Sequence, residues 1–328
     1  MKSIKHNFLL LVIVLLTGLF TQAGATVTLH VNDIDKAYNV LDAYHLLEEF
    51  TNKYPEKNIL FYVHGRKKDI EDEKARMAKL EKYYNVKVLM FHWNSYDKFL
   101  NRPTKNAEEA SLELFEAFQL IRDFKRNHPE FFAERSINLL CHSMGNLVLK
   151  YTIEKYFDEF EQDEIFTNYV GNAPDVPLKD HRTWLSQFKM AQNNYIMMNN
   201  QDFVLTFSYL LDVFNKDLFH YRLGLGFENY LGRRDQEKTK LVPFVNYVDL
   251  SKVLKKDHGY FAYSDRAITE VFNQILNGNP IEDAFLDVNS KIRLVKDKGL
   301  SNSFKIENKV FRKISSTSSQ ENSQSSLD

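Results

Sequence analysis

Residues 136–145 read S-I-N-L-L-C-H-S-M-G, and they carry the strongest indication of the fold. The apolar run at 136–141 predicts a buried strand, and residues 145–157 have a helical pattern. Ser143 therefore lies on a tight turn from strand to helix, where small residues must flank it two positions away on each side. Cys141 and Gly145 meet that requirement. Such a turn lifts the hydroxyl clear of the sheet, which predicts a nucleophile; the alternative is a serine that only caps the helix.

Outward from this turn, apolar runs rich in β-formers alternate with helical patterns. Strands are predicted at 27–31, 58–63, 86–92, 166–171, 194–198 and 245–250, and helices at 33–53, 70–84, 107–127 and 203–214. This alternation predicts an α/β fold with a mainly parallel, doubly wound sheet and helices on both faces. Ligands bind at the carboxyl ends of such strands, so one functional edge is predicted. The turns expected there are those at His64, Ser143, Asp175, Asp202 and His258.

The turn His64-Gly65-Arg66 follows the predicted strand at 58–63. Gly65 lets the backbone come close to its neighbours. The N–H groups of Arg66 and Met144 are therefore the predicted donors of an oxyanion hole. The alternative at Gly65 is a simple glycine turn.

Four short motifs carry a resemblance to a known superfamily. They are V-H-G at 63–65, F-H-W-N-S at 91–95, L-C-H-S-M-G-N at 140–146 and N-A-P-D at 172–175. Over about residues 58–262 the chain resembles the α/β-hydrolase superfamily, and more narrowly its branch of largely uncharacterised bacterial serine hydrolases with an H-S-M-G-N nucleophile elbow. The resemblance implies a Ser, acid, His triad in that chain order and a sheet of about eight strands. Residues 203–244 break the alternation of strands and helices, which predicts an insertion between the last core strands. Cys141 departs from the usual elbow.

A serine nucleophile needs a base, and the base needs a carboxylate that orients it. The fold places the base after the last core strand, which selects His258; His220, in the insertion, is the alternative. Asp202 ends the predicted strand at 194–198 and is the first choice for the acid. Asp175, after the strand at 166–171, is the second. The side chain of His142 is expected to point away from the nucleophile.

The two ends of the chain are predicted to lie outside the fold. Residues 1–25 have a basic start, an apolar run at 8–16 and A-G-A at 23–25, the layout of a secretory signal peptide cleaved after Ala25. The apolar run is shorter than the roughly 20 residues that span a bilayer, so no membrane span is expected after cleavage. Residues 26–314 form the predicted hydrolase domain, and residues 315–328 a disordered tail. Within the domain, residues 203–244 are an insertion, either a lid or a packed helix with a surface loop.

Composition excludes several classes of function. The formal net charge is −1 and no long basic stripe occurs, so a nucleic-acid partner is not expected. The single cysteine, Cys141, excludes an internal disulfide. There is no H-E-x-x-H motif, no cysteine pair and no glycine-rich phosphate loop after a strand, so neither a metal nor a cofactor is expected.

The sequence thus predicts a serine hydrolase, exported to the periplasm or the medium, that cleaves a carboxylic ester or thioester of a small molecule or a lipid. A lipase or acyltransferase for long acyl chains is the second hypothesis, motivated by the aromatic residues between 203 and 230. A non-catalytic binding protein on a hydrolase scaffold is the third, and the intact elbow argues against it.

Overall fold

The computed structural model describes residues 27–98, 100–156, 158, 164–214, 221–227, 241–262, 266–281, 292–296 and 302–308. The predicted signal peptide and the predicted C-terminal tail lie outside these residues. So do residues 215–220 and 228–240 of the predicted insertion, and with them His220. None of the helices in the described ranges has an apolar segment long enough to cross a bilayer.

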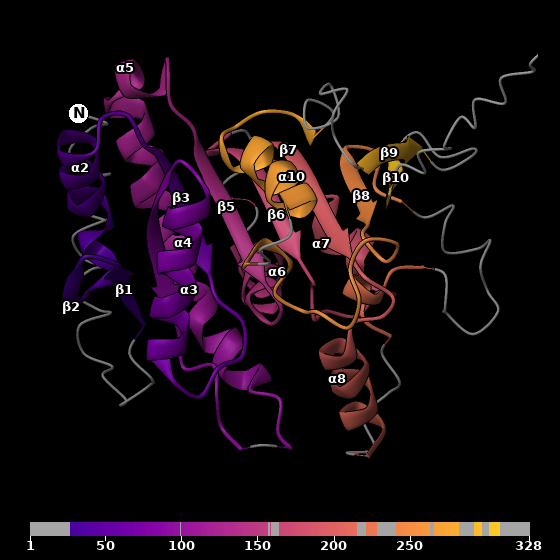
Figure 1. The fold of residues 1–328 in the computed structure, drawn as a ribbon. Coiled ribbons are helices and arrows are strands. Elements are labelled where there is room, and N and C mark those ends of the chain that lie inside the picture. The colour runs from indigo at the N-terminus through magenta and orange to yellow at the C-terminus, as the bar shows by residue number, and fades with distance from the viewer. Residues whose placement is uncertain are drawn as a thin grey trace, which may run out of the picture.

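One sheet of ten strands runs through the described residues (Figure 1). The strands are β1 (Thr28–Val31), β2 (Ile34–Tyr38), β3 (Asn58–Val63), β4 (Val86–His92), β5 (Ile137–His142), β6 (Phe166–Asn172), β7 (Ala191–Met198), β8 (Val245–Asp249), β9 (Ile292–Lys296) and β10 (Ser303–Asn308). Their order across the sheet is β2-β1-β4-β3-β5-β6-β7-β8-β10-β9. The strands from β4 to β10 in that order pair in parallel, and only the edge pairings of β1, β2 and β9 are antiparallel. The predicted α/β class with a mainly parallel sheet is confirmed.

Helices cover both faces of the sheet. They are α2 (Ala43–Lys53), α3 (Ile70–Tyr83), α4 (Thr104–Asn127), α5 (Pro129–Phe132), α6 (Gly145–Tyr156), α7 (His181–Leu185), α8 (Phe203–Phe214) and α10 (Arg266–Leu276), with the short 3-10 turns η1 (Val40–Asp42), η3 (Leu223–Leu225) and η4 (Tyr260–Ala262). Alternate side chains of β3 pack into two apolar cores on opposite faces of the sheet. Phe61 packs with the side of α2, α4 and α6, whereas Leu60 and Tyr62 pack with the side of α3 and α10. The carboxyl ends of the parallel strands open at one edge, and α8 lies beyond that edge in Figure 1.

The helix predicted at 33–53 is wrong over residues 33–42. Residues 34–38 form β2, an antiparallel partner of β1, and the helix begins at Ala43. The turn between the two strands contains Asn32 and Asp33, which favour tight turns, and pairing with β1 overrides the helical spacing. Leu41, in the 3-10 turn η1 before α2, is 66% exposed.

The sheet is also wider than the eight strands implied by the resemblance. The C-terminal strands β9 and β10 extend it beyond β8, on the side of β8 away from β7. The described part of that segment consists of α8, η3 and the turn before β8.

Candidate active site

Ser143 lies on the predicted turn between β5 and α6. Its φ is 52°, a left-handed value that is uncommon for a residue with a side chain and marks a strained turn. The Ser143 N–H donates to the carbonyl of Asn172 on the neighbouring strand at 3.0 Å. Gly145 is required here, because a Cβ at that position would lie 2.4 Å from the carbonyl oxygen of Val63. The structure therefore places Ser143 on a tight turn from strand to helix, as the sequence predicts.

Asn146 holds this turn in place, a role that the sequence did not reveal. Its Nδ2 donates to the carbonyls of Cys141 and Ser143 at 2.9 and 3.1 Å. Its Oδ1 accepts a hydrogen bond from the buried hydroxyl of Tyr169 at 2.8 Å. The only signal in the sequence was the Asn that ends the quoted motif at 140–146.

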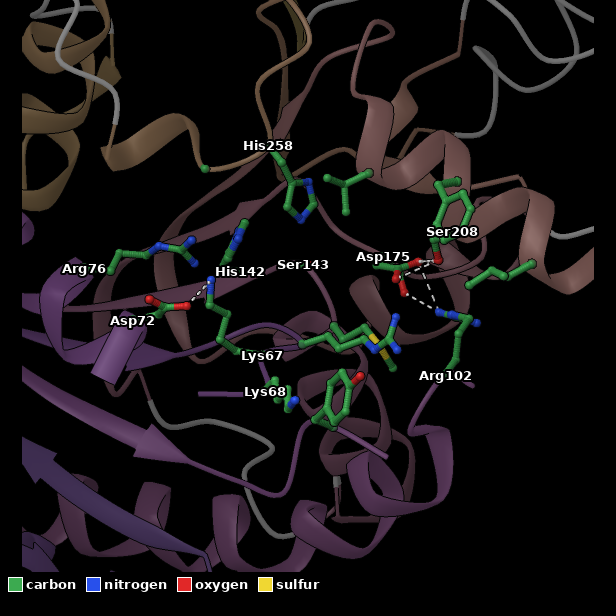
Figure 2. Close-up of a pocket in the computed structure, with 17 residues that line it drawn as sticks. Lys67, Lys68, Asp72, Arg76, Arg102, His142, Ser143, Asp175, Ser208 and His258 are labelled. Atoms are coloured by element: carbon green, nitrogen blue, oxygen red, sulfur yellow. Dashed lines mark hydrogen bonds and ion pairs between the residues drawn. The ribbon is translucent and has the colours of Figure 1, made fainter. Parts of the chain in front are cut away.

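Asp202 contacts His258 directly. Asp202 is fully buried just after β7, and its Oδ2 lies 2.8 Å from Nδ1 of His258. The same oxygen accepts from the Tyr260 hydroxyl at 2.8 Å, while Oδ1 accepts from the N–H of Leu205 at 3.0 Å. A carboxylate acceptor places the proton on Nδ1, which leaves Nε2 as the basic nitrogen of a neutral imidazole. His258 and Ser143 line the same pocket (Figure 2).

Asp175 lies at the same edge but has different partners. Its carboxylate pairs with Arg102 at 3.1 Å and with Arg222 at 2.9 Å, and it accepts a hydrogen bond from Ser208 on α8. Burial opposes ionisation of Asp175, but the two guanidinium groups outweigh it and hold its pKa below the usual value. Arg222, fully buried, also pairs with Asp212 of α8. Asp175 is thus part of a buried ion-pair network that ties α8 to the sheet.

The predicted oxyanion donors flank Ser143. Gly65 lies so close that a Cβ there would approach the Cβ of Ser143 to 2.7 Å, and Arg66 follows it in the chain. Met144 stands one residue before α6, where backbone N–H groups have no partner within the helix. Both residues line the pocket with Ser143.

His142 does not point away from the site, contrary to the prediction. Its ring centroid lies 4.7 Å from that of His258, and it lines the same pocket. Asn172 Nδ2 donates to Nδ1 of His142 at 3.1 Å. Burial, together with the nearby His258, holds the pKa of His142 well below its usual value, so it is neutral near pH 7. Phe261 of η4 packs edge-on against the His142 ring, with the ring centroids 5.2 Å apart, and this contact holds the ring beside His258.

The pocket around these residues has a volume of about 510 Å³. One wall is apolar and comes from α8, with Val204, Phe207 and Leu211. The other side is basic, with Arg66, Lys67 and Lys68 after β3. Among the side chains that the structure describes, no group of three His, Cys, Asp or Glu residues is arranged to hold a metal ion.

Three solved structures resemble the chain in part. An uncharacterized protein from Bacillus cereus ATCC 10987 is 14% identical with a TM-score of 0.39, covering 73% of this chain and 67% of that one. Aspergillus fumigatus lipase B is 16% identical with a TM-score of 0.25, covering 37% of this chain and 25% of the lipase. Esterase PE8 is 10% identical with a TM-score of 0.29, covering 49% of this chain and 79% of the esterase. No curated protein matches the chain.

A family match covers most of the fold. Residues 41–278 match the family described as an alpha/beta hydrolase of unknown function, DUF900. The matched part contains Ser143, Asp202 and His258 and well over half of the 328 residues. The chain therefore belongs to this family of α/β hydrolases.

Proposed function

We propose that this chain is a serine hydrolase that cleaves a carboxylic ester or thioester, with Ser143 as nucleophile, His258 as general base and Asp202 as the orienting acid. The observation that carries the proposal is the 2.8 Å contact between Asp202 and His258, in a pocket that also contains the hydroxyl of Ser143. A buried carboxylate, an imidazole with its second nitrogen basic and a serine on a strained elbow together make an activated nucleophile.

The chemistry follows from these positions. Nε2 of His258 accepts the Ser143 proton as Oγ attacks the carbonyl carbon, and Asp202 stabilises the imidazolium that forms. The negative charge on the former carbonyl oxygen is stabilised by the N–H groups of Arg66 and Met144. His258 then protonates the leaving alcohol or thiol, and an acyl-enzyme remains. Water, deprotonated by His258, releases the acid and restores Ser143.

The role of Asp202 rather than Asp175 as the acid is part of this proposal. Asp202 contacts Nδ1 of His258, whereas the carboxylate of Asp175 is occupied by Arg102, Arg222 and Ser208. Export is proposed as well, on the strength of residues 1–25 alone. Intact mass of the secreted protein, with cleavage expected after Ala25, tests that part.

The first experiment is labelling of the purified protein with a fluorophosphonate, read by intact mass. We expect one adduct on the wild type and none on Ser143→Ala, because the reagent reacts with serines that an adjacent base activates. Hydrolysis of para-nitrophenyl butyrate is expected to be lost in the same variant. An adduct that persists in Ser143→Ala, or a wild type that takes none and hydrolyses no ester, contradicts the proposal.

A second candidate function is hydrolysis or transfer of long acyl chains. The observation in its favour is the apolar surface of α8, where Phe203 is 63%, Val204 46% and Leu210 41% exposed beside the pocket. A series of para-nitrophenyl esters from acetate to palmitate separates the two. A kcat/KM that rises with chain length favours the lipase-like function, and a maximum at short chains favours the esterase.

A further inference from the structure

The pocket carries a surplus of positive charge. Among the side chains that line it, five are basic and two are acidic, namely Arg66, Lys67, Lys68, Arg76 and Arg102 against Asp72 and Asp175. The whole chain has a formal net charge of −1, so this surplus is local. Figure 2 shows Arg76 and Arg102 on opposite sides of the view, with Ser143 and His258 between them. Cations therefore lie on more than one side of the space where a substrate would lie.

Most of these charges are matched by carboxylates. Lys67 pairs with Asp72 at 2.9 Å and Arg76 pairs with Glu73 at 3.0 Å. Arg102 contacts both carboxylates of the buried network, Asp175 at 3.1 Å and Asp212 at 3.5 Å. When the partners Glu73, Asp202, Asp212 and Arg222 are included, six basic side chains face five acidic ones. Among the described side chains, the pocket and these partners thus retain one positive charge.

The loop after β3 contributes three of the cations in a row. Arg66 lies over the Tyr96 ring at 5.2 Å, and its guanidinium donates to the carbonyl of Lys98 at 2.6 Å. Burial lowers the pKa of Arg66, which means that its surroundings disfavour the bare cation. A negatively charged group beside Arg66 and the exposed Lys68 would offset that cost.

The same loop is tied to the reaction centre. Gly65 packs against Ser143, and residues 66–68 follow it in the chain. The three basic residues therefore begin at the proposed oxyanion hole. The wall formed by α8 is apolar, with Val204, Phe207 and Leu211 facing the pocket. A substrate that bridges the two sides has a charged group near the loop and an apolar part along α8.

We infer that the substrate is an anionic ester, with a carboxylate or a phosphate held by Arg66 and Lys68 and an apolar portion held against α8. The inference rests on the proposed serine hydrolase function and specifies its substrate class. The negative charge lies on the acyl or the alcohol part of the ester, a few bonds from the carbonyl that Ser143 attacks. Water cleaves the ester into an acid and an alcohol, one of which keeps the anionic group.

Matched pairs of esters test this inference. In the first pair, para-nitrophenyl pentanoate and mono-para-nitrophenyl glutarate differ by a terminal carboxylate on the acyl part. In the second and third, para-tolyl butyrate is compared with para-carboxyphenyl and para-phosphonophenyl butyrate, which place a carboxylate or a phosphonate on the alcohol part. The readout is anionic selectivity, the ratio of kcat/KM for the anionic ester to that for its neutral partner, after subtraction of spontaneous hydrolysis.

We expect anionic selectivity for at least one pair to fall by about tenfold in Lys68→Gln and in Arg66→Gln, the loss expected for one charge-assisted contact. The pair that responds identifies the anion and its side of the ester. Because the ratio is taken within each variant, a general loss of folded enzyme or of chemical reactivity cancels. Lys79→Gln, which removes an exposed lysine on α3 outside the pocket, is the matched control and is expected to keep the wild-type ratio.

Two outcomes overturn the inference and are distinguishable. If the wild type hydrolyses the neutral esters, Ser143→Ala does not, and the selectivity is the same in all variants for all pairs, the serine hydrolase stands and the anionic substrate is wrong. If the wild type takes no fluorophosphonate adduct and hydrolyses none of the esters, the proposed function fails and the inference fails with it.

Discussion

Asp202 and Asp175 are two buried carboxylates at one sheet edge, and their partners give them different tasks. Asp202 accepts from His258 and Tyr260, a base and a neutral hydroxyl. Asp175 faces two guanidinium groups instead. The sequence placed both at strand ends and ranked them only by position. It could not identify Arg102 and Arg222, because isolated arginines in distant segments carry no sign that they are buried.

The first prediction is that Asp202→Asn lowers kcat by about 10³- to 10⁴-fold while the protein stays folded, because the amide favours the wrong tautomer of His258. The measurement is ester hydrolysis together with circular dichroism. Asp202→Asn with wild-type kcat would remove Asp202 from the proposed triad.

Asp175→Asn is predicted to act on stability instead. It leaves Arg102 and Arg222 buried with one carboxylate, that of Asp212, between them. Breaking a buried pair costs about 3–5 kcal/mol. Urea denaturation measures the loss, and Asp202→Asn serves as the comparison. An Asp175→Asn variant as stable as the wild type would mean that the network contributes nothing to the fold.

At the scale of elements, the site depends on how closely β3, β5 and the turns after them approach. A Cβ on Gly65 would lie 2.7 Å from the Cβ of Ser143 and 3.0 Å from the carbonyl oxygen of His142. Neither neighbour is the end of a flexible side chain, so one of the two turns must shift. The proposed oxyanion donors lie on these turns, which makes their spacing a property of the strand pairing rather than of any one residue.

Gly65→Ala is therefore predicted to lower kcat by about a hundredfold, the effect of losing one oxyanion donor. KM and the unfolding free energy are expected to change less than kcat. Gly259→Ala is a suitable control, because a Cβ at Gly259 meets nothing within 4 Å although the residue lines the same pocket. Equal kcat values for Gly65→Ala and the wild type would exclude the turn after β3 from the oxyanion hole.

The central elements could be predicted from the sequence, and the edges could not. Buried parallel strands such as β3 and β5 are continuous apolar runs, which makes them easy to recognise. The motifs at their ends predicted which turns meet at the site. β2 has the sequence I-D-K-A-Y, in which pairing with β1 determines the conformation more than local preference does. β10 was missed because its identity as a strand depends on its neighbours β8 and β9.

At the scale of the whole molecule, a histidine pair joins the sheet to the site. His64 directly follows β3, and its Nε2 lies 2.8 Å from Nδ1 of His92 at the end of β4. Nδ1 of His64 donates to the carbonyl of Gly65 at 2.7 Å. Burial lowers the pKa of His64 from 6.5 to about 4 and, together with the neighbouring His64, that of His92 from 6.5 to about 3. Both are therefore neutral in the folded protein near pH 7.

Histidines that are neutral when folded make stability depend on pH in a definite direction. Their contribution is complete above the unfolded pKa of about 6.5 and is lost as pH falls toward the folded values, because the unfolded chain then binds more protons. We predict that the unfolding free energy of the wild type falls between pH 6.5 and 4, with a slope of at most about 1.4 kcal/mol per pH unit from each histidine.

Urea denaturation of the wild type, His92→Gln and His45→Gln across this range checks the prediction. The His92→Gln variant is expected to show a shallower slope than the wild type. His45 has a side chain that is 80% exposed, and its replacement is expected to leave the slope unchanged. Identical slopes for all three proteins would show that the buried pair does not govern the acid response.

The only cysteine of the chain is a natural probe of how often the centre of the sheet opens. Cys141 has no exposed surface, and burial raises its pKa well above the ordinary value, so the folded protein shields the thiol from reagents. Reaction with a soluble aromatic disulfide therefore requires β5 to separate from its neighbours. Because Cys141 is two positions from Ser143, the rate of that reaction reports the rate at which the strand that leads to the proposed nucleophile opens, in the native sequence and with no added label.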